Sequence, residues 1–339
     1  MEIHFKSVPF DLAFHPSSPL VAAGLVSGRI HLYRYADCAA DDRPPPRRLW
    51  SCRPHKESCR GLAFVNAGEI LLSVSPDRSI DATGVESGQR VSRFPDAHDT
   101  AINRIVNLTD TTIATGDDGG TIKIWDTRQS RCVGSIAAHE DFVSDLEFVG
   151  EMMELLSVSG DGTLAVSSLR RNKVDFRSEF SEDELLSVVL AKQRTKVVCG
   201  SQSGVLLLYS WGEFQDCDDR FVGHPSSVDS MLKLDEATLI TGSSDGIIRQ
   251  VSILPNRITG VIGEHSDFPV ERLAFSFDKS VLGSVSHDQV LKLWDMTGNS
   301  ASSNGGSGNA SVRNEKEMDR RGKSHVPGGG SSSFFADLL

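Results

Sequence analysis

The sequence of 339 residues has no apolar run near the ~18–20 residues of a membrane helix, and its start, MEIHFKSVPF, lacks the apolar core of a secretion signal. Its six cysteines form no Cys-x-x-Cys pair, which argues against a disulfide framework and a zinc ribbon. Basic residues are not in excess, since 35 Lys and Arg face 46 Asp and Glu, a net charge of −11. We therefore expect a protein of a reducing compartment that binds neither membranes nor nucleic acid directly.

Motifs for cofactors and metals are also missing. The Gly-rich segments GVESGQ (84–89) and GSQSG (200–204) are not followed by the Lys-Ser/Thr that a phosphate-binding loop requires. Cys52 and Cys59 flank His55, but this spacing lacks the closely paired ligands of a structural zinc site. We expect no cofactor and no metal ion.

The sequence does contain a repeat. Seven gap-free strings of eleven residues follow one another at intervals of 50, 42, 42, 42, 42 and 43 residues. In each, the eighth position is aliphatic and the turn before it is rich in Gly, Asp and Ser, which predicts a strand, a tight turn and a second strand. The strings begin at Ala23, Ser73, Thr115, Ser157, Cys199, Thr241 and Ser284.

A short apolar run precedes each string, as at 145–149, and a weaker one follows it, as at 131–136. Four short strands in about 42 residues are the period of one propeller blade. The pattern predicts an all-β, seven-bladed β-propeller over residues 1–298. The alternating Ile3 and Phe5 predict that the segment near Met1–Phe5 adds the outer strand of the last blade and removes an unpaired edge.

Two of the strings carry a family resemblance. IKIWDTR (122–128) and LKLWD (291–295) resemble the Trp-Asp signature of WD-repeat β-propellers, and histidines 17 to 19 residues upstream of five strings occupy the place of that family's Gly-His element. These histidines are His55, His98, His139, His224 and His265.

One recurring set of residues imitates a catalytic triad. His265, Ser284 and Asp288 could pair a nucleophile with its base. The trio recurs around the ring, however, so it resembles the WD-repeat network that links His, Ser or Thr, Asp and Trp within a blade. We therefore predict a structural network and no enzyme activity, with the members His98, Thr115, Asp118, His265, Ser284, Asp288 and Trp294. Asp118 lies one position earlier than its counterparts, so we expect a distorted network there.

A possible partner-binding residue follows the best-preserved signature. The segment 113–128 is similar to WD-repeat substrate receptors that dock on the damaged-DNA-binding adaptor of cullin-RING ubiquitin ligases. An Arg just past a strand end can pair bidentately with a carboxylate. The residues assigned to this contact are Ile122, Ile124, Trp125, Asp126 and Arg128. A plain surface arginine remains the alternative.

An insertion distinguishes the first blade. Its excess residues contain the stretch DDRPPPRR (41–48), which proline stiffens into an extended polar loop. We place this loop on the same face as Arg128. Partner contact and neutral loop growth both remain open.

Residues 299–339 are rich in Ser, Gly and Asn and are predicted to form a disordered tail. Its end, SFFADLL, places Phe334 with Leu338 and Phe335 with Leu339 on one helical face. We expect this motif, with Phe334, Phe335 and Leu338 as anchors, to fold into a partner's groove. An unselected apolar terminus is the alternative.

The whole arrangement resembles the family of WD-repeat-containing protein 55. The carrying features are FDLAFHPSSPLVAAGLVSGRIHLY (10–33), SCRPHKESCRGLAF (51–64), a weak Trp-Asp signature outside two blades, and the aromatic motif of the tail. The resemblance implies a nuclear, often nucleolar, scaffold in ribosomal RNA maturation with some cytoplasmic protein, and a link to the ligase adaptor in plant-like members. Two hypotheses follow: a ligase substrate receptor, or a ribosome-assembly scaffold that binds ribosome-biogenesis factors without a ligase role.

Overall fold

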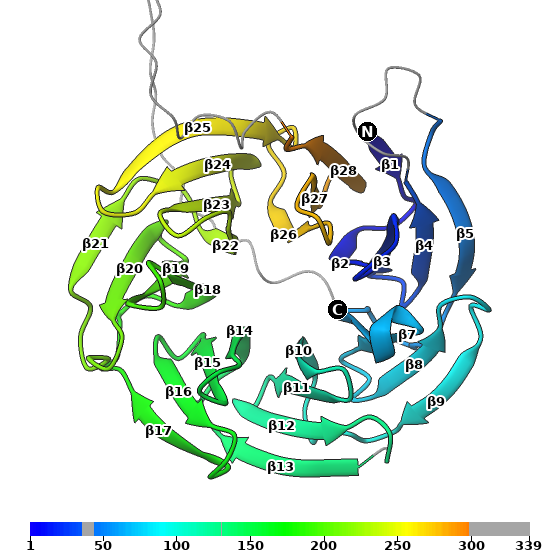
Figure 1. Cartoon of the computed structure of the whole chain (residues 1–339), viewed down its shortest axis with the longest axis horizontal. Helices are drawn as coiled ribbons and strands as arrows, with labels where there is room; N and C mark the ends of the chain where they lie inside the picture. Colours follow the sequence, from blue (N-terminus) through cyan, green and yellow to red (C-terminus); the bar gives the residue numbers. More distant parts are fainter. Residues whose placement is uncertain (36–43, 130, 298–339) are drawn as a thin grey trace, which may run out of the picture. The chain divides into compact units, whose positions relative to one another are not determined.

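A computed structural model describes residues 1–35, 44–129 and 131–297. They form seven antiparallel sheets of four strands arranged as a ring around a central channel (Figure 1). The prediction of an all-β, seven-bladed propeller is confirmed. The predicted disordered tail lies outside the described residues, which all fall within one compact unit, Met1–Ser300.

The first strand of each blade lies nearest the channel in Figure 1, and the last lies at the rim. From channel to rim, blades one to three are β2 (Pro9–Phe14), β3 (Leu20–Leu25), β4 (Ile30–Arg34), β5 (Arg47–Cys52); β6 (Gly61–Val65), β7 (Ile70–Val74), β8 (Ile80–Gly84), β9 (Arg90–Phe94); and β10 (Ile102–Thr109), β11 (Thr112–Asp117), β12 (Thr121–Asp126), β13 (Arg131–Ala137). Blades four and five are β14 (Val143–Val149), β15 (Glu154–Ser159), β16 (Leu164–Ser168), β17 (Lys173–Arg177); and β18 (Leu185–Ala191), β19 (Lys196–Ser201), β20 (Val205–Ser210), β21 (Asp219–Val222).

Blade six is β22 (Val228–Lys233), β23 (Thr238–Ser243), β24 (Ile247–Ser252), β25 (Arg257–Glu264), and blade seven is β26 (Val270–Phe275), β27 (Val281–Ser286), β28 (Val290–Asp295), β1 (Glu2–His4). One short 3-10 turn, η1 (Asn66–Gly68), joins β6 to β7. No helix among the described residues has the length and apolar character that crossing a membrane requires.

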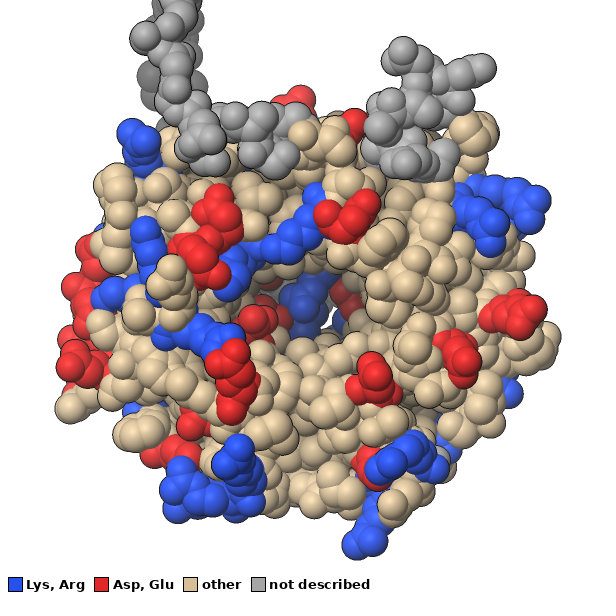
Figure 2. Space-filling view, viewed as in Figure 1, with Lys and Arg blue, Asp and Glu red and all other residues tan. Residues whose placement is uncertain are grey.

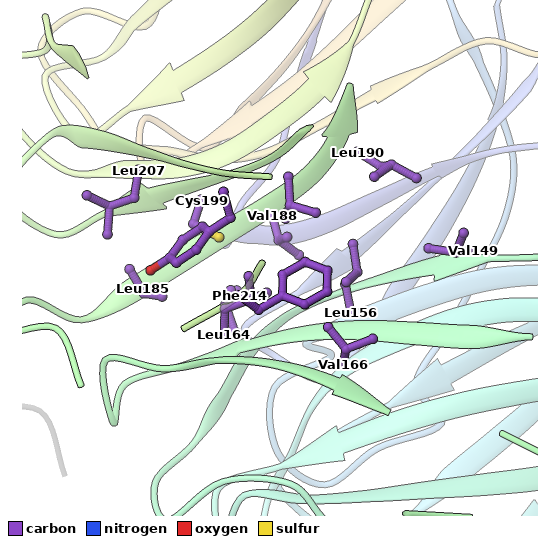
Figure 3. Close-up of a cluster of buried hydrophobic side chains, with 13 residues drawn as sticks. Val149, Leu156, Leu164, Val166, Leu185, Val188, Leu190, Cys199, Leu207 and Phe214 are labelled. Carbon is purple, nitrogen blue, oxygen red and sulfur yellow. The ribbon is translucent and has the colours of Figure 1, made fainter. Parts of the chain in front are cut away.

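Stacking of the blades explains why their middle strands read as continuous apolar runs. Both faces of a middle strand are covered by neighbouring blades, and all six residues of β3 and of β27 are buried. The rim strand β13 alternates between exposed and partly buried residues because one of its faces meets solvent. The apolar core is therefore divided among the blade interfaces, as Figure 3 shows for residues of blades four and five.

A glycine in the turn between the second and third strands sets the spacing of neighbouring blades. Gly120 has a φ of +75°, and a Cβ on it would collide with the main-chain carbonyl of His139 in the loop that leads to the next blade. The amide of His139 donates to the carbonyl of Gly120 at 3.0 Å, so the turn is bonded directly to that loop. Only glycine combines this φ with such close approach.

The N-terminal strand closes the ring, as predicted. β1 pairs with β28 in antiparallel register, with Ile3 opposite Leu291. The side chains of Ile3 and Phe5 are buried and pack against Leu12 and Leu291. Main-chain bonds extend the ladder at both ends, from Leu293 N to Met1 O and from Phe5 N to Gln289 O, each at 2.8 Å. The first residues of the chain thus supply the outer strand that the last repeat lacks.

Ionised side chains from the inner strands cross the channel. Arg272 of β26 lies 3.0 Å from Asp145 of β14 and 3.6 Å from Asp11 of β2, so one guanidinium links blades one, four and seven. Figure 2 shows basic and acidic side chains within the central opening. Burial, followed by repulsion from Asp145, raises the pKa of Glu147 to about 7, although Lys233 and Arg272 act in the opposite direction.

The first prediction tests ring closure. Ile3→Ala should lower the free energy of unfolding by about 2–4 kcal/mol because it removes a buried side chain from the closing strand. His4→Ala, at an exposed position of the same strand, is the control and should change it by less than about 0.5 kcal/mol. Deleting residues 1–6 should lower the melting temperature further and promote aggregation through the bare edge of β28. An unchanged melting transition in the deletion variant would contradict closure by β1.

The second prediction concerns pH. Because the pKa of Glu147 is raised from 4.5 to about 7 in the folded protein, the folded state binds this proton more tightly than the unfolded state does. Proton binding by Glu147 therefore stabilises the fold fully below about pH 4.5, and this stabilisation is lost as pH rises through 7. The free energy of unfolding changes by up to about 3 kcal/mol. Glu147→Gln should remove this dependence in urea unfolding between pH 5 and 8. Glu182→Gln, at an exposed carboxylate, should leave the slope unchanged, and equal slopes in all three proteins would refute the assignment.

Candidate functional site

In blade three, a chain of hydrogen bonds links the rim-side tryptophan to a buried carboxylate. Trp125 Nε1 donates to Thr115 Oγ1 at 2.9 Å. The Thr115 hydroxyl lies 2.7 Å from His98 Nε2, and His98 Nδ1 donates to Asp117 Oδ2 at 2.7 Å. All four residues are buried. The arrangement leaves neither ring nitrogen of His98 free to act on a substrate.

The carboxylate of this network corrects the assignment from sequence. Asp118, the predicted member, lies outside it: Asn103 donates to its carboxylate, and Arg60 lies 3.8 Å away. Side chains alternate along β11, so Asp117 shares the face of Thr115 and Asp118 points away. Asp117 also accepts the main-chain N–H groups of Gly119 and Thr121 and thereby holds the turn. The network of blade three is thus intact, and it differs from the expectation in using Asp117 in place of Asp118.

Blade seven contains the same chain of contacts. Trp294 Nε1 donates to Ser284 Oγ at 2.8 Å, and that hydroxyl lies 2.7 Å from His265 Nε2. His265 Nδ1 donates to Asp288 at 2.8 Å. Both ring nitrogens of His265, which is fully buried, are therefore engaged within the blade. The apparent triad links a loop, a strand and a turn of blade seven, and its histidine and serine are fully buried.

Other blades keep parts of the network. His55 contacts Ser73 and Asp77, and His139 contacts Ser157 and Asp161, without a tryptophan. No group of three or more His, Cys, Asp or Glu among the described residues could hold a metal ion.

Blade six departs further from the pattern. His224 contacts Thr241, but its would-be acid Asp245 pairs with Arg249 at 2.5 Å. Burial, with Arg249 nearby, lowers the pKa of His224 to about 4. This histidine is neutral at physiological pH, and its Nδ1 is buried without a hydrogen-bond partner among the described residues.

The strand end of blade three presents an arginine to solvent. Arg128 donates through Nε to Asp126 Oδ1 at 3.2 Å and through Nη2 to Oδ2 at 2.9 Å. The Arg128 side chain is 66% exposed, whereas that of Asp126 is 13% exposed. The ion pair raises the pKa of Arg128 and lowers that of Asp126. Asp126 therefore holds the guanidinium through Nε and Nη2 and leaves Nη1 without a hydrogen-bond partner among the described residues.

The remaining residues assigned to this contact lie inside the propeller. Ile122 and Ile124 pack in the cluster that contains Val143 and Leu155 of blade four. Trp125 packs on Phe94 of blade two, with ring centroids 5.8 Å apart. These three residues position the strand end, and only Asp126 and Arg128 of the set reach the surface.

The other two predicted interaction segments are only partly described. Residues 36–43 of the blade-one insertion lie outside the described residues, so the predicted position of this insertion on the face of Arg128 stays a prediction. Phe334, Phe335 and Leu338 also lie outside the described residues.

Comparison with known proteins agrees with this architecture, because the family model described as WDR55 matches residues 1–298. The chain belongs to the WDR55 family. It is 53% identical to WD repeat-containing protein 55 of Arabidopsis thaliana over 92% of this chain and 87% of that protein. Identity to the Homo sapiens protein of the same name is 40%, covering 87% and 76% of the two chains.

A third similar protein is WD repeat-containing protein JIP5 of Coprinopsis cinerea, which is 38% identical over 87% of this chain and 74% of that protein. Membership confirms the resemblance seen in the sequence. WD-repeat propellers of this kind are generally non-enzymatic interaction scaffolds. This agrees with the networks of blades three and seven, in which both ring nitrogens of His98 and His265 are engaged within the blade.

Sequence reasoning missed Asp117 and a set of acidic and aromatic residues at the other end of the strands. Asp117 could have been found from the alternation of side chains with Thr115. Phe142, Asp141 and Phe180 lie in loops between blades, where no repeat position marks them. Their arrangement becomes visible only when the blades are stacked.

The third prediction separates the two neighbouring aspartates. Burial raises the pKa of Asp117, but the bonds from His98 and Thr121 outweigh it and hold the pKa below its usual value. Asp117→Ala leaves buried donors without an acceptor and should cost about 2–4 kcal/mol of unfolding free energy. Asp118→Ala removes partly exposed contacts and should cost less than about 1 kcal/mol. Urea unfolding measures both, and equal losses would show that the network does not depend on Asp117.

Proposed function

We propose that the chain is a nuclear, mainly nucleolar, interaction scaffold of ribosome biogenesis that also docks on the damaged-DNA-binding adaptor of a cullin-RING ubiquitin ligase through Arg128. In this role it would present a target to the ligase as a substrate receptor. The observation that carries the proposal is the exposed guanidinium of Arg128, held by Asp126 just past the Trp-Asp strand end. The nuclear setting is what the resemblance to the family of WD-repeat-containing protein 55 implies.

The geometry around Arg128 favours docking for a physical reason. A free arginine side chain loses rotamer freedom when it binds, which reduces the affinity gained from a new hydrogen bond. Two hydrogen bonds to Asp126 hold Arg128, and the Trp125 side chain, three positions earlier, is bonded to Thr115. A partner that offers a carbonyl or carboxylate to Nη1 thus meets a guanidinium that is already oriented.

The same ion pair supports the alternative of a ribosome-assembly scaffold without a ligase role. Asp126 already balances the charge of Arg128, so this arginine needs no partner to be stable on the surface. Exposed pairs of this kind occur on many proteins and contribute little to stability. In this case the partners would be ribosome-biogenesis factors bound elsewhere on the propeller or on the tail.

The fourth prediction decides between these functions. Arg128→Ala should weaken co-purification with the adaptor by more than about tenfold, because truncating one member of a buried, charge-assisted pair costs about 2–5 kcal/mol. Arg171→Ala is the control: Arg171 lies between β16 and β17 on the same face and also forms an ion pair with an aspartate, Asp175, through Nη2. It should leave adaptor recovery unchanged.

Equal adaptor recovery from wild type and Arg128→Ala would leave Arg128 a surface charge and favour the scaffold without a ligase role. Localisation is tested separately, by imaging the tagged full chain with a nucleolar marker. Exclusion from nuclei would contradict both forms of the proposed function.

A further inference from the structure

Three cavities lie in a row at the end of the propeller opposite Arg128. The first, about 630 Å³, opens at the channel mouth and is lined by Phe142 and Asp141 among others. Asp141 also lines a second cavity of about 470 Å³, which reaches Phe180. Phe180 in turn lines a third cavity of about 530 Å³ that extends to Val222 of blade five. The shared residues make one path from channel to rim, here called the radial groove.

The radial groove belongs to the face that bears the turns between second and third strands and the loops between blades. Asp141 lies in the loop from β13 to β14, and Phe180 in the loop from β17 to β18. Arg128 lies in a turn between third and fourth strands, which is at the other end of every antiparallel sheet. The two surfaces are therefore separated by the length of the strands.

Carboxylates dominate the lining of the radial groove. Eight of them line the three cavities, against four guanidinium groups. The carboxylates are Asp118, Glu140, Asp141, Asp161, Glu182, Asp183, Asp229 and Glu271. Burial, followed by repulsion from Glu271, raises the pKa of Asp229 to about 6, although Ser227 and Arg104 act in the opposite direction.

Each of the four arginines donates a hydrogen bond within the protein, and Arg60 and Arg104 also lie 3.8 Å from the carboxylates of Asp118 and Asp145. Arg177 donates to the carbonyl of Ala138, and Arg220 to the sulfur of Cys217. Arg60 bonds Asn103, and Arg104 bonds the carbonyl of Ser144.

By contrast, the side chains of Glu140 and Glu182 are exposed and have no partner among the described residues. With eight carboxylates against four guanidinium groups, the groove carries an excess of negative charge, which disfavours nucleic acid and acidic peptides.

Aromatic rings alternate with these carboxylates. Phe180 is 73% exposed and stands between two hollows, and Val222 beside it is 78% exposed. The half-buried ring of Phe142 lines the channel mouth and rests against Gly160, where a Cβ would collide with it. Large apolar side chains displayed beside cavities are typical of interaction sites.

The loop that carries Phe180 is held rigidly on both sides. Glu179 N donates to Gln215 O at 2.7 Å, and Ser181 N donates to Gly162 O at 3.0 Å. Asp183 accepts the main-chain N–H of Ser203 at 3.0 Å from the neighbouring blade. The ring is thus presented by a fixed backbone, so binding would not incur the cost of ordering the loop.

We propose that the radial groove binds an extended segment of a protein partner in which Lys or Arg residues alternate with aliphatic or aromatic ones. The basic side chains pair with the free carboxylates at Glu140 and Glu182, and the apolar ones pack on Phe142 and Phe180. The inference goes beyond adaptor docking and does not depend on it, because the groove lies at the opposite strand ends. A scaffold with both surfaces can hold a target and an adaptor at once.

The fifth prediction tests this groove with a random nonapeptide library displayed on phage and selected on the full chain. Selected peptides should be enriched in Lys and Arg and carry at least one large apolar residue. The most enriched peptide, made with a fluorescent label, is then titrated by anisotropy. Glu140→Lys/Glu182→Lys should weaken binding by about tenfold or more, and Phe180→Ala by about threefold to tenfold. All three positions are exposed, so the variants should keep the melting temperature of the wild type.

Matched controls come from the opposite face. Glu86→Lys/Glu213→Lys makes the same charge change at exposed carboxylates in turns between third and fourth strands, and Phe277→Ala truncates an exposed ring between β26 and β27. These variants and Arg128→Ala should bind the peptide within about twofold of wild type. Failure to select basic peptides would overturn the proposal. Peptides that bind the groove variants as tightly as the wild type would overturn it as well, whatever the outcome for the adaptor.

Discussion

The pairing of β1 with β28 is the interaction on which the whole ring depends. Every other blade is made from consecutive strands and closes locally, but blade seven needs a strand from the far end of the chain. Three paired residues, Glu2–His4, join the two ends, and the side chains of Ile3 and Phe5 are buried. The ring in turn brings Arg272 to Asp145 across the channel and places each blade against two neighbours. A local ladder of three residues thus fixes a global arrangement.

Alternation of side chains within the strands divides the molecule into structure and surface. In blade three, one face of β11 carries Thr115 and Asp117 into the buried network, while Asp118 points toward Asn103 at the channel mouth. The same network anchors Trp125, the last buried residue before Arg128. Residues that resemble a catalytic triad therefore hold the strand ends in place through hydrogen bonds within the blade. What the blade offers to partners is its turns and loops.

The fold could be predicted from sequence because each blade repeats the same pattern of buried strands, a tight turn and a rim strand. Seven aligned strings were enough to predict blade number, strand order and closure by Ile3 and Phe5. Spacing along the repeat points to Asp118 as the carboxylate of the blade-three network, whereas the alternation of side chains along β11 points to Asp117. The radial groove could not be predicted, since Asp141, Phe180 and Val222 occupy different places in their repeats. Their proximity comes from the packing of neighbouring blades, which no single repeat encodes.

The two ends of the strands therefore suit different kinds of contact. At one end, Arg128 is a single fixed cation whose charge Asp126 already balances, which suits a specific hydrogen bond to a preformed surface. At the other end, an excess of carboxylates alternates with the exposed ring of Phe180 and the half-buried ring of Phe142 along three cavities that share lining residues, which suits a longer and less ordered segment. The buried strands cannot slide past one another without breaking the hydrogen bonds between turns and loops at Gly120 and at the equivalent glycines of other blades. The two ends of the strands therefore stay at a constant separation. Rigid separation of two dissimilar contacts is the physical property that makes a propeller useful as a scaffold.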